Sequence, residues 1–352
     1  MNQSSGFTLD STGYLSQEDT KRYYSRIGLF CFILAAVSFL ISLAAVFLIR
    51  ATVPSLINSD LKKSLLNHIL SFLSIYCIAV PVAILALKPL PTVKPIKEKL
   101  SFGKFLGAFC VCFTFLQVGA YISNFLVSII QRLSGKEITN PLAETFSIGN
   151  LAVDAIFIGI LFPILEELLF RKILCQRLLP IGEKKAVIIS AAVFGLIHGN
   201  LYQFAYAFLI GLVLGYVYVK TGRLIYPIIC HCAINLYAGV FSSYVVSKVR
   251  IEKIYEIMMS ENAMSDPEAL LGQLAPYASD LTVYLIYTYL LLGLSIAGFA
   301  VLLVSVIKKK ITFEQGILPT PKKGRISNFF LTGGVAEAIG FLVFKFIFSI
   351  FI

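Results

Sequence analysis

Two adjacent glutamates in an otherwise apolar stretch are the first residues of this sequence that could do chemistry. They are Glu166 and Glu167, in the segment FPILEELLFRK. Glu167 and Arg171 are four residues apart, so they would share one helix face, where the cation offsets the cost of the carboxylate. Glu166 points about 100° away and has no such cation. Because burial in an apolar site raises the pKa of a carboxylate, we predict that Glu166 can accept a proton from water.

Two later motifs add imidazole and amide groups. His198 follows Phe194 by four residues in FGLIHGN, and His231 precedes Asn235 by four in PIICHCAIN. This spacing puts the members of each pair on one helix face. If the helix carrying Glu166 and the next helix form an antiparallel hairpin, Glu166 and His198 each lie ~20 Å from the shared turn. We therefore predict that three helices bring two carboxylates, two imidazoles and an amide to one depth.

Structural roles are the simpler alternative for each motif taken alone. A single intramembrane Glu–Arg pair is often a structural lock, and a single helix histidine is more often packed than catalytic. Ionisable residues within membrane spans are costly, however, and their co-occurrence at matched depth favours a reactive site. Glu166, His198 and His231 would also suit zinc with water as fourth ligand. Because no HExxH motif is present, we expect no cofactor and keep zinc as the alternative.

The three motifs, in this order, resemble those of the CPBP intramembrane proteases. This family includes the CAAX prenyl endopeptidases and bacteriocin-processing or abortive-infection proteins, and its pattern is EExxxR, then FxxxH, then HxxxN. The resemblance covers about residues 150–240. It implies a bundle of about eight helices, a site that opens toward the cytosol and hydrolysis of a peptide bond by water. It also implies that the Glu167–Arg171 pair orients the site.

The resemblance implies roles for the other four motif residues. Glu166 would be the general base, and His198 would help to position the water. His231 and Asn235 would form the pair that stabilises the oxyanion. The predicted function is therefore that of an intramembrane endopeptidase with a glutamate-activated water.

Three other functions compete with this prediction. One is a zinc-dependent version of the same peptidase, and another is a non-catalytic membrane immunity or scaffold protein of the same fold. A transporter is disfavoured because the sequence has no paired half-helix pattern in two corresponding halves. The expected partners are a peptide or membrane-protein substrate and the lipid bilayer.

The elements that must position these residues follow from composition. The chain has 352 residues, of which 58% are hydrophobic and 14% charged, whereas soluble domains are about half apolar and a quarter charged. Apolar blocks near the ~20 residues of a membrane span recur along the chain, and such blocks must be helical in lipid. We predict an all-α, polytopic transmembrane helix bundle of eight to nine spans. The candidate spans are 27–49, 68–87, 105–131, 151–170, 186–200, 201–219, 224–246, 281–307 and 328–352.

Charge placement predicts the orientation of these spans. The net charge is +11, and with nine spans 21 Lys and Arg residues flank one side against 8 on the other. The richer side should be cytoplasmic, so the N-terminus lies inside and the C-terminus outside. The charges flank spans and form no single stripe, which argues against nucleic-acid binding. Short loops and a polar start without a cleavable signal favour a multi-pass protein of the bacterial plasma membrane.

The chain divides into four predicted regions, with no second soluble domain. Residues 1–26 would be a polar cytoplasmic tail, and 27–149 the N-terminal transmembrane helices. Residues 150–240 would form the peptidase core. An outer loop and the C-terminal transmembrane helices would occupy 241–352. Residues 88–104, with three prolines and five lysines, would be a stiff linker on the inside.

Overall fold

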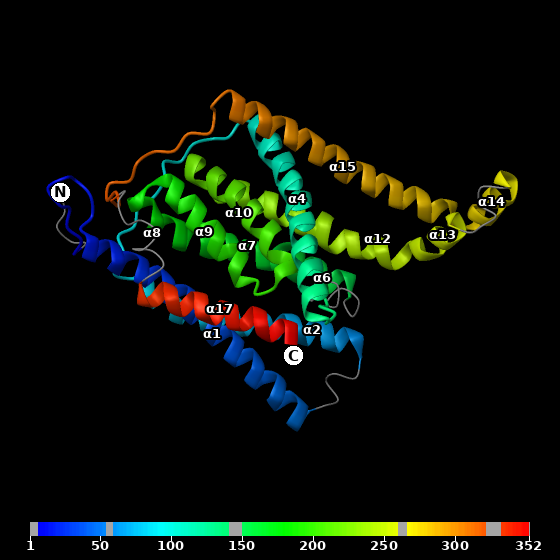
Figure 1. Cartoon of the computed structure of the whole chain (residues 1–352), viewed down its shortest axis with the longest axis horizontal. Coiled ribbons are helices and arrows are strands. Elements are labelled where there is room, and N and C mark those ends of the chain that lie inside the picture. The colour runs from blue at the N-terminus through cyan, green and yellow to red at the C-terminus, as the bar shows by residue number, and fades with distance from the viewer. Residues whose placement is uncertain (1–5, 54–58, 141–149, 260–265, 322–331, 352) are drawn as a thin grey trace.

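The computed structural model describes residues 6–53, 59–140, 150–259, 266–321 and 332–351. Helices dominate these residues (Figure 1), and their only β-feature is an isolated bridge between Leu9 and Leu15. The predicted all-α class is therefore confirmed.

The N-terminal helices are long. They are α1 (Gln17–Thr52), then α2 (Asp60–Ser71), η2 (Phe72–Ala79) and α3 (Val80–Leu87) in one run, and α4 (Phe102–Ser134). Helix α1 begins after Ser16, whose hydroxyl accepts a hydrogen bond from the Asp19 N–H over 3.1 Å, as an N-cap should. Helix α4 ends at Gly135, whose φ of 65° suits a left-handed C-cap.

The helical run that carries Glu166 alternates between α- and π-helical turns. Its parts are α6 (Leu151–Ile156), η3 (Phe157–Leu161), α7 (Phe162–Glu167), η4 (Leu168–Cys175), α8 (Gln176–Leu178) and the 3-10 turn η5 (Leu179–Ile181). Pro163 lies in the first turn of α7, directly after the π-helical η3. Since proline has no N–H to donate, it interrupts regular α-helical bonding there. π-Helical turns are frequent at functional sites.

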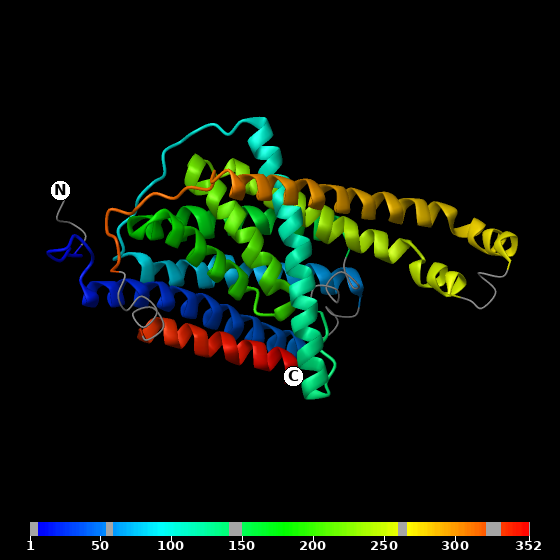
Figure 2. The same ribbon diagram turned by 45° about the horizontal axis from the view of Figure 1, so that its top comes forward.

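The next helices complete the region of the motifs. They are α9 (Glu183–Ile197), α10 (Leu201–Thr221), α11 (Ile225–Ile234), η6 (Asn235–Phe241) and α12 (Ser242–Lys248). The turn from α9 to α10 uses Gly199 with a φ of +68°, and the Asn200 side chain caps α10 by accepting from the Gln203 N–H. Helices α9 and α10 consequently run side by side (Figures 1 and 2).

The C-terminal part is also helical, including much of the predicted outer loop. It contains α13 (Ile251–Met258), α14 (Pro267–Leu274), η7 (Ala275–Tyr277), α15 (Ala278–Ile307) and α17 (Gly333–Phe351). Val245, Val249 and Ile254 are buried against side chains of the returning helix, among them Tyr284. This packing makes α12 to α15 a helical hairpin whose α13 and α14 end extends beyond the other helices (Figure 1), whereas α15 packs directly against α4 at Gly298.

Among the described residues, six helical runs are long and apolar enough to cross a membrane. They are Gln17–Thr52, Leu61–Leu87, Phe102–Ser134, Leu201–Thr221, Ile225–Val245 and Pro267–Ile307. Each contains one of the nine predicted spans or nearly all of it. The predicted spans 151–170, 186–200 and 328–352 are largely helical where the structure describes them, but they are not among these six; 328–331 and 352 lie outside the described residues. Helix α9 has 15 residues, about 22 Å, which is less than the ~30 Å hydrocarbon core.

The main hydrophobic core joins the first helices to the motif helices. Tyr23, Phe30, Leu174 and Phe194 are among its fully or almost fully buried members. Helix α17 lies directly against α1, and a β-carbon on Gly28 would fall 2.2 Å from the backbone of Gly334. The close contact therefore depends on glycine.

Candidate active site

The buried centre of the site is the ion pair between Glu167 and Arg171. The Arg171 Nε donates to Glu167 Oε2 over 2.8 Å, and neither side chain is exposed. Arg171 also donates to Ser190 Oγ of α9 over 3.4 Å, and its guanidinium lies 5.6 Å from the centroid of the Phe194 ring. The predicted i,i+4 pair is thus present, and it links its own helical run to α9.

His231 of α11 connects the two glutamates. Its Nδ1 lies 3.0 Å from Glu167 Oε1, and its Nε2 lies 3.6 Å from Glu166 Oε2. Because the Glu167 carboxylate can only accept, Nδ1 carries the hydrogen in this contact and Nε2 faces Glu166. The separation from Glu166 exceeds that of a direct hydrogen bond.

Glu166 is the accessible carboxylate of the pair. Its side chain is 21% exposed, whereas that of Glu167 is fully buried. The Tyr76 hydroxyl of η2 donates to Glu166 Oε1 over 3.4 Å, and the Tyr76 ring stacks on Phe162. Sequence reasoning missed Tyr76, because one tyrosine in an apolar helix gives no signal without knowledge of the packing.

His198 lies at the C-terminal end of α9 and meets the cluster through an aromatic ring. Its Nδ1 lies 2.7 Å from the Phe194 carbonyl oxygen, so that nitrogen donates and Nε2 is left as an acceptor. The Phe194 ring stands edge-on to both imidazoles, 5.1 Å from His198 and 5.5 Å from His231. The imidazole within ion-pair distance of Glu166 is that of His231, and the water-positioning role that the resemblance implies for His198 stays a prediction.

Asn235 begins the π-helical η6, one turn after His231. Its amide nitrogen donates to the Ile158 carbonyl of η3 over 3.0 Å. An amide group has two N–H donors, so one remains after this bond. The structure thus places Asn235 on the helix of His231 but anchors it to the π-helical turn that precedes Glu166.

The zinc alternative rests on Glu166, His198 and His231. Among the described residues, no group of three or more His, Cys, Asp or Glu side chains is arranged to hold a metal ion. The contacts of His198 with the Phe194 carbonyl and of His231 with Glu167 use Nδ1 of each ring, so neither contact occupies Nε2. The metal-free site stays a prediction.

A second buried acid–imidazole pair escaped the sequence analysis. His68 Nε2 of α2 lies 2.7 Å from Asp154 Oδ1 of α6, and both side chains are about 5% exposed or less. The His68 ring stacks on Phe157 and also meets Phe162, which in turn contacts Tyr76. The sequence signal that could have revealed this pair was an aspartate and a histidine, each within an apolar segment.

Comparison with known proteins finds similarity to a family and to two relatives in part of the chain. Residues 148–237 match the type II CAAX prenyl endopeptidase Rce1-like family. A Bacillus subtilis (strain 168) protein named "Putative membrane peptidase YdiL" is 32% identical over 107 residues, which cover 29% of this chain and 43% of that protein. "UPF0177 protein YxdF" of Lactococcus lactis subsp. lactis (strain IL1403) is 28% identical over 124 residues, or 33% of this chain and 68% of that protein. No solved structure matches the chain.

The matched segment contains all six motif residues and every contact among them described above. The match spans less than half the length of the first relative and about two thirds of the second. The match to the family model confirms the predicted resemblance. Over residues 148–237 this protein is therefore similar to the Rce1-like type II CAAX prenyl endopeptidases, which are peptidases.

Proposed function

We propose that this protein is an intramembrane endopeptidase that hydrolyses a peptide bond with a water activated by Glu166. One observation carries the proposal. Two adjacent carboxylates share one imidazole, yet Glu167 is neutralised by Arg171 and fully buried, whereas Glu166 is partly accessible. A general base needs both access to the reacting group and freedom to take up a proton, and only Glu166 has both.

The first chemical step transfers a proton from water to Glu166. The water oxygen attacks the carbonyl carbon as its O–H bond breaks, and the Glu166 carboxylate takes the proton. His198 Nε2, free to accept because Nδ1 donates to Phe194, would hold the other hydrogen of the water. This places the oxygen lone pair toward the substrate carbonyl.

The second step breaks the C–N bond of the tetrahedral intermediate. The second N–H of the Asn235 amide would stabilise the negative oxygen while it exists, and His231 would add a donor at Nε2 when its ring carries both hydrogens. Glu166 then returns its proton to the leaving amine, so that base and acid are the same residue. No step in this scheme passes through a metal ion.

The charged connecting segments support a site that opens to the cytoplasm. Residues 88–104, 171–185 and 308–325 carry much of the excess of Lys and Arg. The described residues 88–104, 172–185 and 308–321 of these segments lie toward one end of the bundle, near the N-terminal residues (Figure 1), where Val93 N–H donates to the Gln176 carbonyl and Leu318 N–H to that of Pro180. By the positive-inside rule this end faces the cytoplasm.

Peptide turnover tests the proposal. The full-length protein, purified in mild detergent, is incubated with a peptide library, and new termini are identified by mass spectrometry. We expect cleavage by the wild type, none by Glu166→Ala and unchanged cleavage by Glu268→Ala, which alters an exposed glutamate of α14. Binding of peptides without any cleavage would point to the non-catalytic alternative.

A further inference from the structure

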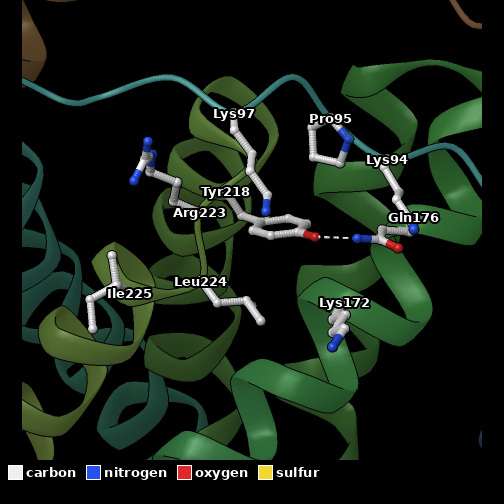
Figure 3. A pocket seen from close by; sticks show the side chains of 10 residues that line it. Lys94, Pro95, Lys97, Lys172, Gln176, Tyr218, Arg223, Leu224 and Ile225 are labelled. Atoms are coloured by element: carbon white, nitrogen blue, oxygen red, sulfur yellow. Dashed lines mark hydrogen bonds between the residues drawn. The ribbon is translucent and has the colours of Figure 1, made fainter.

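A second site lies outside the motif residues, at the end of the bundle rich in Lys and Arg. A pocket of about 500 Å³, within the usual range of ligand pockets, is formed where residues 94–97 cross the ends of α8 and α10 and the start of α11 (Figure 3). It shares no residue with the candidate active site. Its lining residues are Lys94, Pro95, Lys97, Lys172, Gln176, Tyr218, Gly222, Arg223, Leu224 and Ile225.

The pocket is strongly cationic. Four of its ten lining residues are Lys94, Lys97, Lys172 and Arg223, and none of the ten is acidic. Over the described ranges of the chain, no carboxylate lies within ion-pair distance of these four side chains. By contrast, the neighbouring Lys220 is paired with Glu183 over 2.6 Å. The charge in the pocket is thus left for an external anion.

Arg223 supplies an independent sign of a missing partner. Its Nε is buried, and no described residue accepts a hydrogen bond from it. A buried donor without an acceptor is costly, and such groups are rare in folded proteins. The Nε atom has almost no exposed surface, so a ligand in the pocket would bind the terminal N–H groups of Arg223, or would reach Nε after the side chain turns. Phosphate oxygens suit this side chain, because arginine binds them through several N–H groups at once.

The pocket is held in shape by the backbone and by buried polar groups. The Gln176 amide donates to the Tyr218 hydroxyl over 2.5 Å at its base (Figure 3), and both residues are buried. Glu98 N–H donates to the Thr221 carbonyl over 2.8 Å, which fixes the crossing segment to the end of α10. A β-carbon on Gly222 would fall 2.5 Å from the Ile96 carbonyl oxygen, so this close crossing requires glycine.

The position of the pocket favours a membrane lipid as the source of the anion. Both Leu201–Thr221 and Ile225–Val245 are long enough to span a membrane, and the pocket lies between the end of the first and the start of the second. Lipid phosphates lie at this level of a bilayer. Leu224 and Ile225 add an apolar edge, and Ile225 is 53% exposed. A ligand with a phosphate beside acyl chains fits this combination better than a free anion does.

We propose that this pocket binds the phosphate of an anionic phospholipid. Lys94, Lys97, Lys172 and Arg223 would surround the phosphate, and the acyl chains would lie along Ile225. The bound lipid would join residues 94–97 to η4, which carries Lys172 directly after Arg171. This proposal does not depend on the peptidase mechanism, because its evidence comes from the pocket and its position.

Lipid binding to the full-length protein tests the proposal directly. The protein in neutral detergent is titrated with short-chain phosphatidylglycerol, with phosphatidylcholine of the same chain length, and with inorganic phosphate. Thermal unfolding and native mass spectrometry report binding. We expect phosphatidylglycerol to raise the melting temperature and to remain bound in the mass spectrometer, and the other two additives to do neither at equal concentration.

Matched lysine variants locate the site. Lys94→Gln/Lys97→Gln should weaken phosphatidylglycerol binding roughly 25-fold, from about a fivefold contribution by each cation. Lys99→Gln/Lys104→Gln removes the same charge from exposed positions near the pocket and should leave binding unchanged. Arg223→Gln, which replaces the unsatisfied donor, should also weaken binding.

Three results would overturn the proposal. Equal effects of the two lysine pairs would mean that binding follows net charge and not the pocket. If phosphatidylcholine bound as tightly as phosphatidylglycerol, binding would not require a lipid with a net negative charge. Stabilisation by inorganic phosphate at the same concentration would assign the pocket to a soluble anion. Peptide cleavage is not used in any of these measurements, so failure of the catalytic proposal would leave them interpretable.

Discussion

At the scale of single residues, two neighbouring carboxylates have different surroundings. Glu167 accepts from Arg171 and from His231 in a fully buried position. Glu166 has only a tyrosine hydroxyl at 3.4 Å and an imidazole at 3.6 Å, and it is partly exposed. The two side chains are therefore suited to different tasks, one structural and one reactive.

Glu166→Gln should be almost inactive and still folded. Loss of a general base lowers the rate about 10²–10⁴-fold, and glutamine keeps the size of the side chain and the contact with Tyr76. Initial cleavage rates and the melting temperature should be measured together. Glu268→Gln serves as the control. A variant that cleaves at more than about a tenth of the wild-type rate would remove Glu166 from the role of base.

Asn235→Ala should lose less activity, about 10²–10³-fold as is typical of one oxyanion donor. The loss should fall on kcat with little change in KM, because such a donor acts on the transition state. A purely structural role, through the bond to the Ile158 carbonyl, would instead lower the melting temperature. An unchanged kcat would exclude Asn235 from the oxyanion site.

Exhaustive chelation should leave the wild type active. The geometry of Glu166, His198 and His231 does not bring them together as a ligand set. A catalytic zinc site needs one ion per chain. Elemental analysis of the active protein should therefore find less than about one zinc per chain. If a chelator abolishes cleavage and zinc alone restores it, these three residues are ligands and the proposed mechanism is wrong.

At the scale of elements, the Glu167–Arg171 pair holds three helices together. It bonds to Ser190 of α9 and to His231 of α11 from its own helical run. The π-helical turns η3, η4 and η6 lie directly beside these contacts. Irregular helix geometry thus occurs where the candidate site is assembled.

Glu167→Gln should lower stability as well as activity. It leaves Arg171 buried without its anionic partner, and removing one partner of a fully buried pair costs about 3–5 kcal/mol. Thermal unfolding in detergent should therefore show a clear drop in melting temperature, whereas Glu166→Gln should show little. Equal melting temperatures for the two variants would mean that the buried pair contributes nothing to the fold.

At the scale of the whole molecule, the charged connections gather at one end of the bundle. Leu15 N–H, near the start of α1, donates to the Pro319 carbonyl, and Glu98 N–H donates to that of Thr221. Segments far apart in sequence therefore lie at one face of the molecule. This agrees with the prediction that the connections rich in Lys and Arg lie on one side of the membrane. The hairpin from α12 to α15 extends from the bundle (Figure 2).

Cysteine labelling should report this topology. Thr12 and Lys99 are exposed on the side proposed to be cytoplasmic, and Glu268 is exposed on α14. In intact cells an impermeant maleimide should label Glu268→Cys only, and Thr12→Cys and Lys99→Cys should react after permeabilisation. Labelling of Thr12→Cys and Glu268→Cys from the same side would be incompatible with the seven predicted spans between them, and the short α9 would then be the first span to reconsider.

Local patterns were enough to predict the all-α class and most of the long apolar helices. Apolar blocks of span length must be helical in lipid, so the class and most spans followed from composition. The Glu167–Arg171 contact followed from its spacing of four, because that spacing fixes two side chains on one helix face. The outer loop predicted within 241–352 contains helices that local patterns did not predict, because the amphipathic α13 packs against the returning hairpin.

Only the tertiary structure decided how those residues meet. The resemblance gives His198 a role in positioning the water, and only the crossing of α11 shows that His231 lies between both glutamates. Tyr76 reaches Glu166 from a helix 90 residues away in sequence, and the cationic pocket combines three separate segments. Contacts between distant segments depend on crossing angles and on side-chain packing, which no local spacing encodes. The chain by itself therefore determined which groups are available, and the packing of the helices determined which of them act together.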